Sequence, residues 1–357
     1  MKTKQAALAY IPKLPHISGL VFALLASLFS MWFVAELPHW TGGHNFGLSS
    51  LTLAILLGIV LGNTVYPQSG SILNLGVGYT KGQVLRLAIM LYGFKLTFTQ
   101  VENVGIAAIL TDILTLSSTF LLACWLGIKV FKMDKETSIL VGAGSSICGA
   151  AAVIATEPVL KAQSYKVTIA VATVVVFGTT AMLIYPMFYH MGWLHQWLND
   201  SQYGIYEGST IHEVAQVVVA GNAVSPAAAG TAVITKMIRV MMLAPFLLIL
   251  SFFLVGKGEN GEKITFGQKV RQVQVPWFAF IFIGVVALHT WVPFGAETVK
   301  SMVWLDNLLL TMAMFALGLT THISAIKNAG IKPLILGIIL FAWLILGGAG
   351  INVLINH

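Results

Sequence analysis

The sequence predicts an all-α polytopic membrane protein, organised as a single membrane domain over residues 1–357. Its composition is the first observation: 57% of the residues are hydrophobic and only 9% are charged, whereas soluble proteins carry about 25% charged residues. Its patterning is the second, because the apolar residues gather in runs long enough to cross a bilayer. The net charge of +7 comes from Lys and Arg in short loops, as membrane topology requires. We therefore expect a lipid bilayer as the surroundings and no nucleic acid as a partner.

Apolar runs bounded by turn residues predict about nine full membrane spans. These spans cover residues 17–37, 50–67, 84–101, 105–128, 164–190, 231–255, 275–292, 303–322 and 332–355. The first run is expected to be retained, because it is longer than the roughly 7–15 apolar residues of a signal peptide. The segments 17–128 and 231–355 are then flanking helices that form a scaffold and a core.

Two Gly/Ser-rich segments, 137–160 and 207–226, remain between these spans. Both contain the word Gly-Ser-(Ser/Thr)-Ile, followed by small and β-branched residues, and both end at a proline. A break of this kind at membrane depth is tolerated only where protein or a water-filled cavity covers the freed backbone groups. We therefore expect the two segments to be paired broken-helix elements that hold the substrate.

The distribution of basic residues orients the chain, with the N-terminus cytoplasmic and the C-terminus periplasmic. The residues expected on the cytoplasmic side late in the chain are Lys257, Lys263, Lys269, Arg271, Lys327 and Lys332. If 137–160 dips into the membrane and returns, Lys161 and Lys166 also lie inside. The two elements then enter from opposite sides in an inverted-repeat arrangement. The alternative is that both elements cross as broken helices, which gives 11 spans.

The candidate binding site follows from the chemistry of a helix end. The first N–H groups of a helix lack intrahelical acceptors and favour an anion, serine adds hydroxyl donors, and glycine permits close approach. The candidate substrate-binding residues are Gly144, Ser145, Ser146, Cys148, Gly149, Gly208, Ser209, Thr210, Gln216 and Asn222. The alternative for each motif is close helix packing through small residues.

Ionisable residues at membrane depth are candidates for coupling substrate to a second ion. The candidate coupling residues are His212, Glu213, Asp112 and Arg239. His212 is able to exchange a proton near physiological pH, and Arg239 would neutralise Glu213 or attract an anion. Lys236, on the same expected span as Arg239, would reach the outer surface by snorkelling.

No cofactor is expected. The two cysteines, Cys124 and Cys148, form neither a disulfide framework nor a metal cluster. The sequence contains no Walker loop and no dinucleotide fingerprint, so transport driven by ATP within this chain is not expected. An intramembrane enzyme is the least favoured alternative; it would use Ser145, Ser209 or Cys148 as nucleophile and His212 as base.

Both motifs resemble the YeiH family, a bacterial inner-membrane family labelled as sulfate exporters. The resemblance is carried by residues 142–152, 206–217 and 222–223, and it extends to 58–63 and 316–319. The family is grouped with the cation:proton antiporter and anion transporter superfamily. That grouping implies inverted repeats, discontinuous helices and an elevator-type movement of a core against a scaffold. It also implies a homo-oligomer, such as a dimer, in the bacterial inner membrane.

Together, the residues and the resemblance predict a secondary active transporter rather than an enzyme. Its expected partners are a small anion, such as a sulfur oxyanion or a sulfonate, and a coupling ion such as the proton. The alternative is a cation/proton antiporter, with Asp112 and Glu213 as its deep acidic residues.

Overall fold

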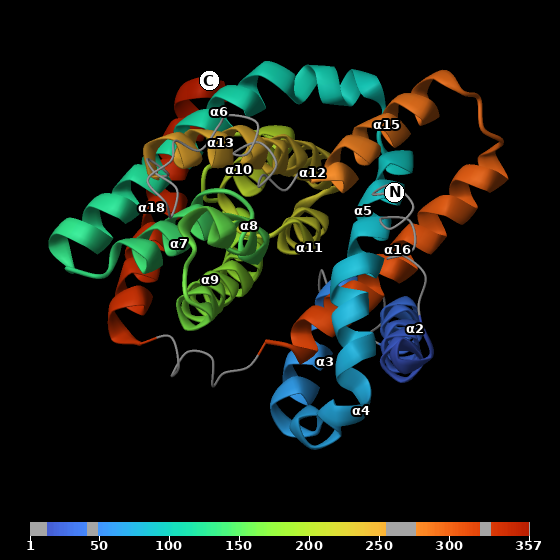
Figure 1. Ribbon diagram of the computed structural model, residues 1–357. Helices are drawn as coiled ribbons and strands as arrows, with labels where there is room; N and C mark the ends of the chain where they lie inside the picture. Colours follow the sequence, from blue (N-terminus) through green and yellow to red (C-terminus); the bar gives the residue numbers. More distant parts are fainter. Residues whose placement is uncertain (1–12, 41–48, 255–275, 322–329, 357) are drawn as a thin grey trace, which may run out of the picture. The chain divides into compact units, whose positions relative to one another are not determined.

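The protein was analysed as a computed structural model that describes residues 13–40, 49–254, 276–321 and 330–356. These residues are helical and contain no strand (Figure 1). The main helices are α2 (Ile17–Trp40), α3 (Ser50–Thr64), α4 (Tyr66–Tyr79), α5 (Leu85–Tyr92), α6 (Phe98–Cys124), α7 (Lys135–Ser146), α8 (Ala150–Leu160), α9 (Ser164–His190), α10 (Asp200–Thr210), α11 (Val214–Val224), α12 (Pro226–Met241), α13 (Leu243–Leu254), α15 (Trp277–Trp291), α16 (Ala296–Leu319) and α18 (Ile331–Asn356).

Within the described residues, six stretches are long and apolar enough to cross a membrane. They are Leu14–Trp40, Val104–Val130, Tyr165–His190, Pro226–Phe252, Ala296–Leu319 and Ile331–Ile355. The count of nine full spans is not confirmed. α3 and α15 have 15 residues each, whereas a span needs about 20. The span expected at 84–101 is divided, because α5 ends at Tyr92 and α6 begins at Phe98.

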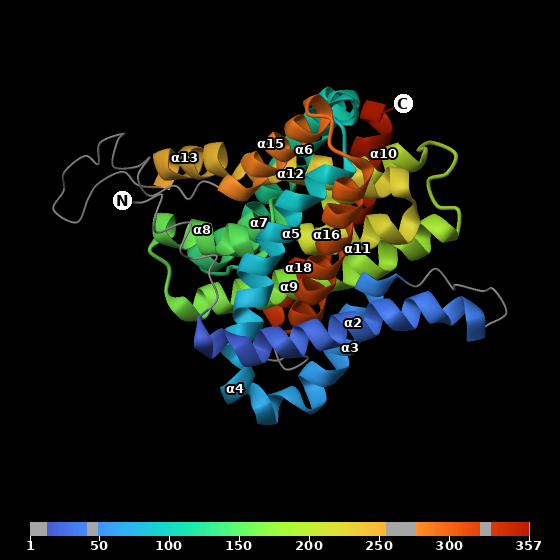
Figure 2. The ribbon, with the colours of Figure 1, turned by 90° about the vertical axis from the view of Figure 1, so that its right-hand side faces the viewer.

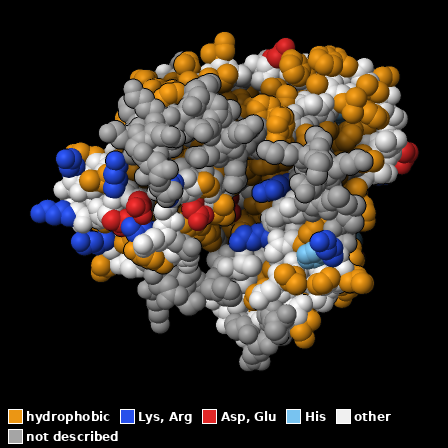
Figure 3. Space-filling model, viewed as in Figure 1, with side chains coloured by type: hydrophobic (Ala, Val, Ile, Leu, Met, Phe, Trp, Pro, Cys, Tyr) orange, Lys and Arg blue, Asp and Glu red, His pale blue; other side chains and the backbone are white. Residues whose placement is uncertain are grey.

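The exterior is apolar, as a lipid-facing surface requires. Large hydrophobic side chains on α6 are mostly exposed, among them Ile106, Ile113 and Leu121, and hydrophobic side chains gather along the upper part of the face drawn in Figure 3. The basic residues Lys257, Lys263, Lys269, Arg271 and Lys327, which were used to orient the chain, lie outside the described residues.

The chain divides into two compact units. The first comprises residues 1–98 and 280–323, and the second comprises residues 99–279 and 324–357. Within the first unit α16 packs closely on α3, where Gly58 and Gly318 bring the two backbones together. Lys95 also forms an ion pair with Asp306 of α16, with 2.7 Å between Nζ and Oδ2. The second unit contains both Gly/Ser motifs.

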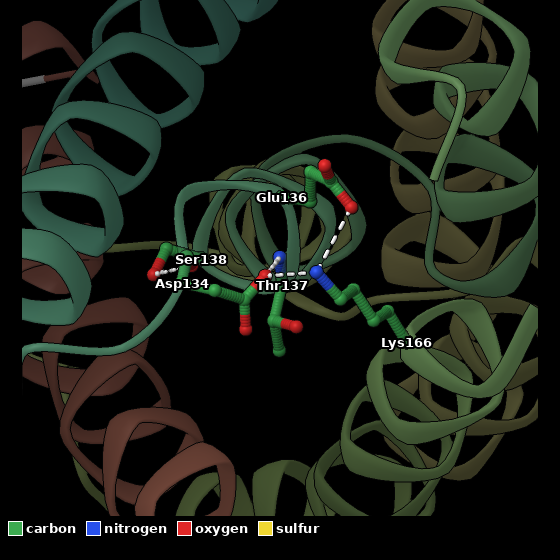
Figure 4. Close-up of polar contacts among 5 residues, drawn as sticks. All are labelled: Asp134, Glu136, Thr137, Ser138 and Lys166. Atoms are coloured by element: carbon green, nitrogen blue, oxygen red, sulfur yellow. Dashed lines mark hydrogen bonds and ion pairs between the residues drawn. The ribbon is translucent and has the colours of Figure 1, made fainter. Parts of the chain in front are cut away.

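The first motif is a helical hairpin. α7 starts beside the start of α9, because Lys166 Nζ lies 3.0 Å from carboxylate oxygens of Asp134 and Glu136 (Figure 4). α7 ends beside the middle of α9, where a Cβ built on Gly144 would lie 2.7 Å from Val174. α7 and α9 are therefore parallel. α8 connects the end of α7 back to the start of α9, so it runs antiparallel to both.

The second motif repeats this design. The hydroxyl of Thr231 in α12 donates to the carbonyl of Ser201 near the start of α10, at 2.8 Å. Lys236, further along α12, bonds Ile211 just after the end of α10. α10 and α12 are therefore parallel, and α11 returns between them to Ser225, whose side chain caps α12. The element starts at Asp200 rather than at the expected residue 207, because Asn199 forms a capping box there.

The two hairpins approach α9 from opposite ends. The open end of the first lies at Lys166, near the start of the 27-residue α9. The open end of the second lies at the end of α9, where Tyr189 donates to Asp200 at 2.6 Å and His190 contacts the carbonyl of Ala223 at 3.0 Å. Figure 2 shows α7 and α8 on the left and α10 and α11 on the right. The turns of both hairpins meet near the middle of α9.

Candidate functional site

The candidate site consists of the two hairpin tips, Ile147–Cys148–Gly149 and Ile211–His212–Glu213. In both hairpins the Gly-Ser-(Ser/Thr)-Ile word forms the last turn of the first helix: α7 ends at Ser146 and α10 ends at Thr210. The expectation that these words supply helix-start N–H groups is therefore wrong. The last turn of a helix presents carbonyl groups, with about −0.5 of an elementary charge. The N–H groups belong to α8 and α11.

Two buried cations of α12 bind the carbonyl ends of α7 and α10. Lys236 donates to the carbonyls of Ile147 and Ile211, at 2.8 and 2.6 Å. Arg239 donates through Nε to the carbonyl of Ser146 at 2.8 Å and through Nη1 to that of Ser209. Both side chains are 0% exposed. The snorkelling expected of Lys236 is wrong, since its ammonium group joins one hairpin tip to the other.

Glu213 lies at the opposite, N-terminal ends of α8 and α11. Its carboxylate accepts the N–H of Ala150 in the other hairpin at 3.4 Å. It also accepts the N–H of Gln216, and the Gln216 side chain accepts the N–H of Glu213 at 3.0 Å, which forms a capping box. One carboxylate therefore serves both positive helix ends.

Gly149 makes this close approach possible. Its φ of +67° is favourable for glycine and strained for other residues. In addition, a Cβ at this position would lie 2.5 Å from Cγ of Glu213. In the structure Gly149 allows contact between the two tips, and its predicted contact with substrate stays a prediction.

Buried polar groups without hydrogen-bond partners surround the tips. Within the described part of the chain, Nδ1 of His212 and Nε2 of Gln216 have none, and the two side chains are at most 2% exposed. Native proteins rarely leave buried polar atoms unpaired, and exceptions indicate water or an ion. These atoms are free to contact a ligand at the tips.

Two further acids are buried in this unit. Asp112 of α6 is 0% exposed, is close enough to Arg239 and Lys236 to interact electrostatically, and has no hydrogen bond to either carboxyl oxygen among the described residues. Glu207 of α10 also has no hydrogen bond to either carboxyl oxygen among the described residues. It lies close enough to Tyr185 and Tyr203 to interact with them electrostatically. Sequence reasoning missed Glu207 as a deep acid, although it directly precedes the second Gly-Ser word.

The other candidate residues have identifiable places. Ser145, Cys148 and Thr210 are buried at the tips, and Ser209 accepts a hydrogen bond from Asn352 of α18 at 3.1 Å. Gly208 instead packs against the backbone of α12. The structure does not bring Asn222 to the tips, because it lies near the far end of α11 and donates to the carbonyl of Val218 at 2.7 Å.

A cavity of about 310 Å³ lies at the open end of the second hairpin. Amide and hydroxyl side chains from α6, α10 and α12 line it, including Gln100, Gln202 and Thr231, together with Ile234 of α12. Ile234 is two residues from Lys236 in α12. The cavity therefore extends along α12 from Pro226 to Ile234.

The described residues contain no group of three or more His, Cys, Asp or Glu placed to hold a metal ion. The residues named as a possible nucleophile and base do not pair either. Among the described contacts, His212 has no hydrogen bond to Ser209, and the hydroxyl of Ser209 donates to the carbonyl of Tyr206 at 3.1 Å. The groups at the tips that could bind a ligand are the opposed helix ends, the two basic side chains and the buried polar atoms.

Comparison with known proteins shows close relatives over nearly the whole chain. The family described as Conserved hypothetical protein 698 matches residues 18–337. The UPF0324 membrane protein YPO1307/y2878 of Yersinia pestis is 53% identical over 98% of this chain and 93% of its own. The UPF0324 inner membrane protein YeiH of Escherichia coli K12 is 53% identical, over 95% and 94%. No solved structure matches significantly.

Proposed function

The chain belongs to the UPF0324 family of membrane proteins, as YeiH does, and we propose that it is a secondary active transporter of a small anion. The anion would be a sulfur oxyanion or a sulfonate, moved together with a proton or in exchange for another ion. The observation that carries the proposal is the meeting of two opposed hairpin tips, joined by Lys236 through the carbonyls of Ile147 and Ile211.

Opposed hairpins suit transport because each gives the shared site a route to one side. We propose that both hairpins are re-entrant, that they form an inverted repeat, and that the remaining helices complete about nine spans. Transporter sites of this kind lie near the bilayer midplane, at discontinuous helices. The tips meet at the middle of α9, which has 27 residues and a length of about 40 Å. Movement of one unit against the other would expose the site alternately.

Anion selectivity follows from the charges at the tips. The N-terminal ends of α8 and α11 converge on Glu213 and attract negative charge. Lys236 and Arg239 add two basic side chains at the carbonyl ends of α7 and α10. The amide nitrogen of Gln216 supplies a buried donor that would bind an oxyanion oxygen, and Nδ1 of His212 would add a second donor when it carries a proton. We propose that Glu213, His212 and Asp112 couple the anion to protons.

A cation/proton antiporter is the second candidate, and one observation favours it. Asp112 and Glu207 are fully buried carboxyl groups, and none of their oxygens has a hydrogen bond among the described residues. A buried carboxyl without partners is a common ligand for a coupling cation or a proton. Asp112→Asn would abolish proton exchange in an antiporter, whereas anion binding at the tips would persist.

We further propose that the protein is not an enzyme, needs no cofactor and works as a homo-oligomer, such as a dimer, that anchors the scaffold. Relatives are named inner membrane proteins, which supports the same location here. We keep the orientation with a cytoplasmic N-terminus and a periplasmic C-terminus as part of the proposal.

The test is ligand-dependent thermal stability of the purified protein. A ligand at about 100 times its Kd stabilises the folded state by about 2.7 kcal/mol. Sulfate, sulfite or methanesulfonate should raise the melting temperature of the wild type and of Gln163→Leu, an exposed control, but not of Gln216→Leu. If only sodium or potassium stabilises the protein, the anion proposal is wrong and the antiporter takes its place.

A further inference from the structure

We propose that Glu213 is a built-in competitor of the substrate. In the present conformation its carboxylate occupies the position of the substrate's anionic group, and the anion binds only when a proton has neutralised Glu213. This inference rests on the proposed anion transport and specifies how the proton is coupled. It predicts that one proton is bound for each monovalent anion.

The first argument is geometric. The carboxylate of Glu213 accepts N–H groups from the first turns of two 11-residue helices, α8 through Ala150 and α11 through Gln216. These two ends are the positive ends of the hairpins. A substrate anion attracted to them meets a carboxylate already bound there. Both cannot stay, because like charges in one desolvated site repel strongly.

The second argument comes from the unpaired donors beside this carboxylate. Oε1 of Gln216 accepts the N–H of Glu213 at 3.0 Å, so Nε2 of the same amide lies at the same helix end. Nε2 has no partner within the described residues, and Gln216 is 0% exposed. Nδ1 of His212, the residue directly before Glu213, is likewise buried and has no hydrogen-bond partner within the described residues. The site therefore offers at least one donor, Nε2 of Gln216, that Glu213 does not use, and Nδ1 of His212 would be a second when it carries a proton.

The third argument is the charge balance at the tips. Lys236 of α12 and Cys148 of the first hairpin lie close enough to Glu213 to interact with it electrostatically, and Arg239 of α12, Asp112 of α6 and His212 interact in the same way with Lys236. With Asp112 and Glu213 ionised, the two acids balance the two cations. An added anion would leave one buried charge uncompensated, which is costly. One proton on Glu213 restores the balance.

Accessibility selects Glu213 rather than Asp112 as the proton acceptor. Asp112, Lys236 and Arg239 are each 0% exposed. Glu213 and Ala150 are half-buried, and Ala151 is exposed. Among the two acids that balance the cations, Glu213 is thus the one that water and an arriving anion reach in this conformation. Proton uptake and anion binding therefore occur at the same place.

Glu213→Gln is the decisive variant because it removes the charge and keeps an oxygen that accepts the N–H groups of Ala150 and Gln216. The control is Glu157→Gln, which removes a carboxylate of α8 near the open end of the hairpin. Thermal unfolding without ligand verifies that each variant folds. The probe is methanesulfonate, which stays monovalent, and binding is measured by calorimetry between about pH 5 and 8.

For the wild type and Glu157→Gln, we expect affinity to fall about tenfold per pH unit as pH rises, with uptake of one proton per anion. Glu213→Gln should bind with nearly constant affinity and without proton uptake. Unchanged pH dependence in Glu213→Gln, or pH-independent binding by the wild type, overturns the inference and leaves anion transport intact. If methanesulfonate and sulfate bind no variant at any pH, the proposed function itself fails and the inference falls with it.

Discussion

Replacing Lys236 by methionine tests whether this buried cation holds the hairpin tips together. Methionine keeps much of the side-chain volume but cannot donate to the carbonyls of Ile147 and Ile211. Each carbonyl left unsatisfied in a buried site costs about 1–3 kcal/mol. Removing the desolvated ammonium group offsets part of this cost. We expect a net loss of about 3 kcal/mol in the free energy of unfolding.

The matched control is Lys166→Met, which removes a cation that also contacts two oxygens. Its partners, Asp134 and Glu136, have side chains that are 47% and 38% exposed, and exposed ion pairs contribute about 0–1 kcal/mol. Both variants would be unfolded reversibly in mixed detergent and compared with the wild type. The reasoning is refuted if Lys236→Met costs no more than Lys166→Met, because the tips would then not depend on the buried cation.

Three further predictions follow from the tips and from the start of α7. Gly149→Ala should destabilise the protein by about 2 kcal/mol, because of the positive φ and the contact with Glu213. The control is Gly350→Ala, which has open space around its Cβ and should be neutral or stabilising. Equal melting temperatures of the two variants would refute this prediction. Gln216→Leu should weaken sulfate binding at least tenfold in calorimetry, and unchanged affinity would remove this residue from the site. Burial opposes ionisation of Asp134, but the Thr137 N–H and Lys166 outweigh it and lower the pKa of that carboxyl. Its ionised form therefore adds stability above the unfolded value of about 3.9, and that stability is lost as pH falls; melting curves of Asp134→Asn should lack this acid dependence, and a retained one would contradict the assignment.

Composition and span-length runs were sufficient to predict the helical membrane class, because both depend on local sequence alone. The structure also has a helix end at each motif, where the Gly-Ser word interrupts the large apolar residues. The number of spans was harder to predict. α3 and α15 are mostly apolar yet have only 15 residues each. Apolar residues also continue beyond the ends of helices, so they do not mark where a helix ends.

The sequence did not show which end of a helix each Gly-Ser word forms. The word Gly144–Ser145–Ser146 is compatible with either end of a helix, and only the structure shows that α7 ends there. The role of Lys236 was missed for a related reason. A lysine eleven residues into α12 snorkels or is buried according to whether backbone carbonyls from distant segments converge on it.

The most direct test of the central claim is flux through the reconstituted protein. Vesicles containing the wild type, Gln216→Leu or Gln163→Leu would receive labelled sulfate or methanesulfonate under an imposed pH gradient. Our account predicts accumulation of at least one of these anions driven by the gradient, retained in Gln163→Leu and lost in Gln216→Leu. It is contradicted if no anion accumulates while sodium or potassium exchanges for protons, or if Gln216→Leu transports as well as the wild type.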